Sequence, residues 1–87
     1  MRRTVEVEVF GQALAVATDD GDEHLRRVAA DVDARMRAAA AATRSASSLA
    51  VAVVTALNIA SEYQKLKTEH ARLQEAIDRL AARLSSQ

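Results

Sequence analysis

The chain contains no cysteine and no proline, and its 87 residues include only two glycines and two aromatic side chains. Without cysteine there is neither a disulfide framework nor thiolate chemistry, which suits a reducing compartment. Both glycines, Gly11 and Gly21, lie in the first quarter, so no strong helix breaker follows them. The length fits one small domain, and with only Phe10 and Tyr63 as aromatics a single-chain core is thin. Domains of this kind often gain stability by oligomerising.

The charge is balanced, with 12 basic and 12 acidic residues and a formal net charge of +0. Nonspecific binding to nucleic acid or to an anionic membrane needs a net basic face, so this balance argues against both. The most apolar run, residues 49–60, is shorter than the roughly 20 residues of a membrane-spanning helix. The first residues, MRRTVEVEV, lack an apolar core, so we expect no signal peptide and no membrane insertion.

The N-terminal residues predict a β-hairpin. In residues 4–10, TVEVEVF, three valines alternate with two glutamates, a period of two that is typical of a half-buried strand. Gly11 can adopt a positive φ, and the alternation resumes at residues 13–16. Because an isolated hairpin is barely stable in water, its valine face needs a helix to pack on.

Two helices are expected after the hairpin. Residues 18–23, TDDGDE, favour a helix start through capping and the helix dipole. Apolar side chains then recur at helical spacing as far as residue 40. Residues 43–48, TRSASS, form the only interior break, where Ser45, Ser47 or Ser48 could cap a second helix. The chain thus divides into a head over residues 1–44 and a long helix over residues 45–87.

The long helix carries the pattern of a coiled coil. Residues 49–60 are apolar nearly all round, and a heptad register with alternating steps of three and four begins near Ile59. In a parallel dimer, Glu62 would pair with Lys67 of the second copy, a weak contact that favours this orientation. The residues expected at the interface between two copies are Leu49, Val53, Ala56, Leu57, Ile59, Ala60, Tyr63, Leu66, His70, Leu73, Ile77, Leu80 and Leu84.

No group of residues points to catalysis, a cofactor or a metal. His24 and His70 are the only histidines, and neither has a second histidine or a cysteine at metal-binding spacing. A site built from His70 with Glu62 and Glu69 across a dimer axis competes with a simpler interpretation, a polar heptad position that sets register. The acidic residues Asp19, Asp20, Asp22 and Glu23 lack the spacing of a calcium loop. We therefore expect a non-enzymatic α+β protein, oligomeric through its long helix.

Four features of the sequence, taken in order, carry a family resemblance. VEVFGQALAV, an acid-rich helix start, DVDARM and LAVAVVTALNIASEYQKL follow one another in an order that resembles the ZapA family of bacterial cell-division proteins. The resemblance implies a hairpin-and-helix head, long helices paired in a parallel dimer, and two dimers joined as an antiparallel tetramer. It also implies binding to polymers of the tubulin-like GTPase FtsZ, which the family cross-links and stabilises at the mid-cell division site in the cytoplasm.

The resemblance transfers less well to single residues. Some members place a basic residue after the Phe-Gly of the hairpin, where this chain has Gln12, and a charged residue where it has Leu49. A basic residue between the helices is matched by Arg44. The residues expected to contact FtsZ are Gln12, Arg35, Arg37 and Arg44.

Two other functions compete with this one. The first is a nucleic-acid-associated dimer that would use the arginines of the first helix, although the interleaved Asp31 and Asp33 indicate a mixed, solvated face. The second is a generic coiled-coil adaptor, which would form the dimer but would not bind FtsZ.

Overall fold

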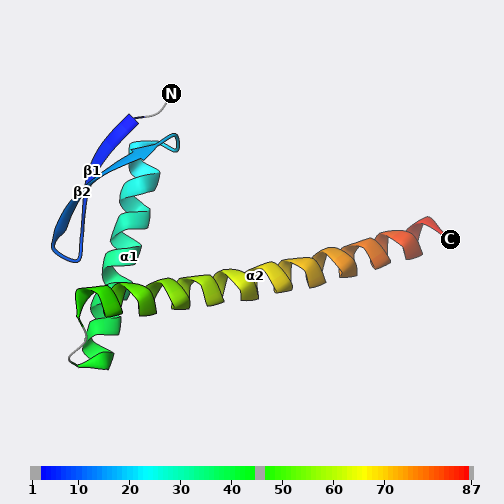
Figure 1. Ribbon diagram of the computed structural model, residues 1–87. Helices are drawn as coiled ribbons and strands as arrows, with labels where there is room; N and C mark the ends of the chain where they lie inside the picture. The colour runs from blue at the N-terminus through cyan, green and yellow to red at the C-terminus, as the bar shows by residue number, and fades with distance from the viewer. Residues whose placement is uncertain (1–2, 45–46, 87) are drawn as a thin grey trace. The chain divides into compact units, whose positions relative to one another are not determined.

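The computed structural model describes residues 3–44 and 47–86 (Figure 1). Two strands, β1 (Arg3–Val9) and β2 (Gln12–Thr18), are followed by two helices, α1 (Asp22–Thr43) and α2 (Ser48–Ser85). This confirms the expected α+β order of a hairpin, a helix and a much longer helix. The chain forms two compact units, Met1–Thr55 and Ala56–Gln87, so the first turns of α2 belong with the hairpin and α1.

The hairpin has the tightest kind of connection. β1 and β2 pair antiparallel, with Val9 opposite Gln12, which leaves only Phe10 and Gly11 in the loop. Both loop residues have positive φ angles, 52° and 76°. That combination defines a type I′ turn, whose twist matches the right-handed twist of the two strands. The predicted turn at Gly11 is confirmed, and Phe10 occupies the position where glycine, asparagine or aspartate is usual.

The alternating strand packs on a helix, as its pattern predicts. Val5 is only 5% exposed, whereas Glu6 and Glu8 are exposed on the other face of the sheet. β1 contacts α1, on which Ala29 is buried, and the hairpin lies alongside α1 (Figure 1). Small alanine side chains on α1 allow this close approach, so the valines of β1 and the apolar face of α1 bury each other.

A second part of the core joins α1 to α2. Met36 and Ala39 of α1 are buried together with Val51 of α2, which is 1% exposed. Partly buried apolar residues of the hairpin, Val9 and Phe10, pack against this cluster. The turn of the hairpin is therefore supported by both helices of the first unit.

The two helices begin in different ways. Ser47 Oγ accepts a hydrogen bond from the Ala50 N–H at 3.1 Å, so Ser47 is the cap expected for the second helix. Ser45, the other candidate before α2, lies outside the described residues. The expectation of a capping side chain on α1 is wrong, because its N-cap is Gly21, with a φ of 87° and no side-chain cap. Asp22 and Glu23 instead favour its first turn through the helix dipole.

Among the described residues, neither helix alone has both the length and the apolar character needed to cross a membrane. Only α1 and α2 counted together meet those criteria, and they do so by length and composition alone.

Candidate partner-binding surface

Three side chains meet at the tip of the hairpin and form what we call the turn cluster: Phe10, Asp33 and Arg37. The Phe10 N–H donates to Asp33 Oδ1 at 2.7 Å, across 23 residues of sequence. Asp33 Oδ2 accepts from Arg37 Nε at 2.9 Å, one turn further along α1. The guanidinium carbon of Arg37 lies 5.9 Å from the centre of the Phe10 ring, within the range of a cation–π contact. One carboxylate thus joins the backbone of the turn to an arginine of α1.

The charges of the turn cluster stabilise one another. The hydrogen bond from Arg37 and, after it, the backbone N–H of Phe10 hold the pKa of Asp33 below its ordinary value of 3.8. The same hydrogen bond, with the charges of Asp33 and Glu8, raises the pKa of Arg37. Both groups are therefore charged at neutral pH, and the turn cluster presents a fixed ion pair beside an aromatic ring.

Acid should weaken the turn because the folded pKa of Asp33 lies below its unfolded value. Its contribution to the free energy of unfolding is complete above about pH 4 and is lost as the pH falls through the folded pKa. Thermal unfolding measured from about pH 6 to about pH 2 should show this loss, and Asp33→Asn should remove that part of the pH dependence. An Asn variant that loses stability along the same acid curve would contradict the assignment to Asp33.

A shallow pocket of about 260 Å³ adjoins the turn cluster within the first unit. Its lining comes from the hairpin, α1 and the start of α2, and consists of Val9, Phe10, Gln12, Leu14, Met36, Ser48 and Leu49. The pocket brings together Gln12 and Leu49, which sequence reasoning assigned to different roles. Gln12 also follows the turn directly, so it shares one end of the hairpin with Phe10.

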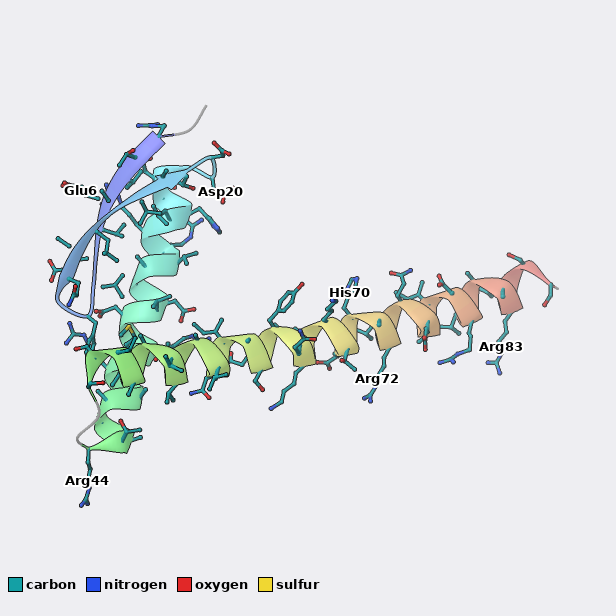
Figure 2. All side chains as sticks on the ribbon, in the orientation of Figure 1. Glu6, Asp20, Arg44, His70, Arg72 and Arg83 are labelled. Atoms are coloured by element: carbon teal, nitrogen blue, oxygen red, sulfur yellow. The ribbon has the colours of Figure 1, made fainter. Side chains whose placement is uncertain are left out.

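The other two predicted contact arginines are Arg35, within α1, and Arg44, directly after it. Arg35 Nε donates to Asp31 Oδ1 at 3.0 Å, along the helix. Arg44 follows the last residue of α1 and has a positive φ of 63°; its side chain points away from the helix (Figure 2). Because Asp31 and Asp33 each pair with an arginine one turn away, α1 carries a mixed charged face, as its sequence predicts.

An exposed apolar row follows α2 in the second unit. Leu57, Tyr63, Leu66, Leu73, Ile77, Leu80 and Leu84 are between 57% and 75% exposed in the single chain. Ala56, Ala60 and His70 are exposed as well, and Ile59 is half-buried. Nearer the start of α2, Leu49 and Val53 are also exposed. An apolar row of this length is typical of a surface that another helix covers. The heptad assignment of these residues stays a prediction.

Asp33 is the site residue that sequence reasoning missed: the sequence places it in DVDARM and on a mixed charged face, and neither observation gives it a role in binding. Its partner Arg37 is four residues away, a spacing that the sequence shows. Its bond to the Phe10 N–H depends on how the hairpin docks on α1, which no local pattern contains. Among residues 3–44 and 47–86, no three histidine, aspartate or glutamate side chains gather as a metal site.

Comparisons with known proteins agree on one family. The family model described as "Cell division protein ZapA" matches residues 5–86. A Bacillus anthracis protein of that name is 41% identical over 73 residues, which cover 84% of this chain and 82% of the relative. One from Geobacillus kaustophilus is 40% identical over 73 residues, 84% of this chain and 80% of the relative. A solved ZapA mutant dimer from Geobacillus stearothermophilus matches with a TM-score of 0.74 and 36% identity, covering 90% of this chain and 91% of that one.

Proposed function

Because the chain belongs to the ZapA family of cell-division proteins, we propose that it binds, cross-links and stabilises FtsZ protofilaments. It thereby promotes assembly of the division ring at mid-cell, in the cytoplasm. The family is one of structural cell-division proteins and not of enzymes. The observation that supports the proposal is that the turn cluster of the hairpin and an exposed apolar row on α2 occur in one chain of this family.

Cross-linking requires at least two heads in one particle. The solved relative is a dimer, and the apolar row of α2 supports the same assembly here, a parallel homodimer that can join a second dimer as an antiparallel tetramer. Each head then contributes a weak contact, and a filament that repeats its binding sites raises the overall affinity through effective concentration. A single chain would bind a filament without linking it to another.

The surface proposed to contact FtsZ lies on the first unit. It includes Arg37 of the turn cluster and Gln12 beside it, with Arg35 on α1 and Arg44 at the end of that helix. Arginine supplies planar donors that match carboxylates, so this surface fits an acidic segment of the filament.

Co-sedimentation with FtsZ assembled in GTP tests the proposal, with a GDP sample as the control for polymer. We expect the protein to pellet with polymer, and electron microscopy to show thicker bundles. A protein that stays in the supernatant at low salt and high concentration would refute FtsZ binding and favour a coiled-coil adaptor with another partner. A mobility shift of DNA or RNA at low salt would favour the nucleic-acid alternative, whose binding would weaken steeply with salt.

Arg44→Glu should weaken co-sedimentation while leaving the oligomer intact. Reversing one exposed charge at an interface costs about 1 kcal/mol, or roughly a fivefold loss of affinity. Arg72→Glu is the control, because it makes the same charge reversal on α2 (Figure 2). Arg72 lies outside the proposed FtsZ surface and is not one of the predicted interface residues of α2. Equal binding by the Arg44 and Arg72 variants would remove Arg44 from the contact surface.

A further inference from the structure

We propose that Asp33 is the positioning residue of the partner-binding surface. Its carboxylate holds the hairpin turn and Arg37 in one arrangement, and that arrangement presents Arg37 to a carboxylate-bearing segment of the FtsZ filament. This inference rests on the proposed function, and it concerns a residue that the binding partner need not touch.

Asp33 supports the backbone of the hairpin turn at Phe10. Phe10 has a φ of 52°, a conformation that is unfavourable for a bulky side chain and that asparagine or glycine would adopt more easily. The bond from the Phe10 N–H to Asp33 Oδ1 is short, 2.7 Å, and is made to a charged acceptor. Asp33 therefore stabilises a turn that the Phe10 side chain disfavours.

The other carboxylate oxygen of Asp33 holds Arg37. Asp33 Oδ2 accepts a hydrogen bond from Arg37 Nε, while the two terminal nitrogens of Arg37 donate to no described residue. The Arg37 side chain is 62% exposed and lies over the Phe10 ring. A guanidinium held in this way keeps its outer donors for a carboxylate, and it loses less conformational freedom on binding than an unrestrained arginine would.

Asp31 provides a natural comparison within the same helix. It also pairs with an arginine four residues later, at 3.0 Å, and it lies two residues before Asp33. No hydrogen bond joins Asp31 to the hairpin among the described residues. Asp31→Ala therefore removes an equal charge and an equal kind of ion pair without touching the turn.

The two oxygens of Asp33 can be separated by substitution. Asp33→Asn keeps one oxygen to accept the hydrogen bond from the Phe10 N–H. The NH2 group then facing Arg37 is a donor and cannot accept a hydrogen bond from the guanidinium. Asp33→Ala removes both bonds at a position where alanine favours the helix. In co-sedimentation with FtsZ we expect Asp33→Asn to bind about threefold and Asp33→Ala about tenfold more weakly, whereas Asp31→Ala, which leaves the Phe10 bond in place, should lose less affinity than Asp33→Ala.

A double-mutant cycle separates positioning from a general loss of structure. If Asp33 acts through Arg37, then Arg37→Gln and the double variant Asp33→Asn with Arg37→Gln should bind equally weakly. Amide spectra should show that the Asn variant keeps the folded hairpin. The Phe10 N–H resonance should be shifted downfield by its charged hydrogen bond in the wild type but not in the Asn variant.

Additive losses in the cycle, or wild-type binding by Asp33→Ala, would overturn the inference while FtsZ binding stands. Failure of the wild type to pellet with polymer would overturn the proposed function itself, and this inference with it. Matching losses in Asp31→Ala and Asp33→Ala would also overturn it, because they would reflect the net charge of α1 alone.

Discussion

Leu73→Asp is expected to convert the proposed dimer into single chains of 9.4 kDa while the head stays folded. Leu73 is 59% exposed in the single chain, so an aspartate there disturbs no packing within one copy. If the heptad assignment is right, this position is buried in the proposed dimer, and each dimer would contain two unpaired buried charges at a cost of about 3 kcal/mol or more. Light scattering coupled to size-exclusion chromatography measures the mass directly.

The control for this prediction is Gln64→Asp. At 100° per residue, nine residues place Gln64 on the opposite side of α2 from Leu73, so its aspartate faces solvent in the expected dimer. We expect this variant to keep the wild-type mass. Ile77→Asp should behave like Leu73→Asp, and an intact dimer in both would show that the heptad assignment is wrong.

The second large effect is expected at Val51. This side chain is 1% exposed and packs with Met36 and Ala39, where the hairpin turn also contributes Phe10. Val51→Asp would bury an unpaired charge and lower the free energy of unfolding by about 3–5 kcal/mol. This loss is comparable to the whole free energy of unfolding of a small domain. Amide hydrogen exchange should show loss of protection throughout the hairpin and α1.

Val28→Asp is the matched substitution for Val51→Asp. Val28 lies on α1 and is 43% exposed, so the same exchange places its charge in solvent. We expect a change in the free energy of unfolding within about 1 kcal/mol. Similar losses of protection in the two variants would contradict the core described for the first unit.

Much of the fold could be predicted because its signals are local. The valine–glutamate alternation of β1 shows which face is buried, and Gly11 with its neighbours shows the turn. Ser47 marks the start of α2 because capping depends on a side chain and a backbone group three residues apart. The N-cap of α1 could not be predicted in the same way. An acidic stretch favours a helix start both through side-chain capping and through the helix dipole, and at Gly21 only the dipole contributes.

The candidate surface could be predicted only in part. The family resemblance points to Gln12, Arg35, Arg37 and Arg44, and the roles of all four in binding stay predictions. Asp33 could not be found from sequence, because its bond to Phe10 joins residues 23 apart. Sequence shows that Asp33 and Arg37 share a helix face, but it does not show which loop a docked hairpin brings to that face.

The second strand has a consequence for handling the protein. β2, with the sequence QALAVAT, contains no charged residue and no proline, whereas β1 contains arginine and glutamates. Charged side chains and proline are the usual means by which an edge strand resists pairing with other chains. Seven uncharged residues with β-branched members approach the composition of segments that stack in fibrils. When the head opens, β2 is therefore the segment that favours aggregation, and protein concentration will limit work with destabilised variants.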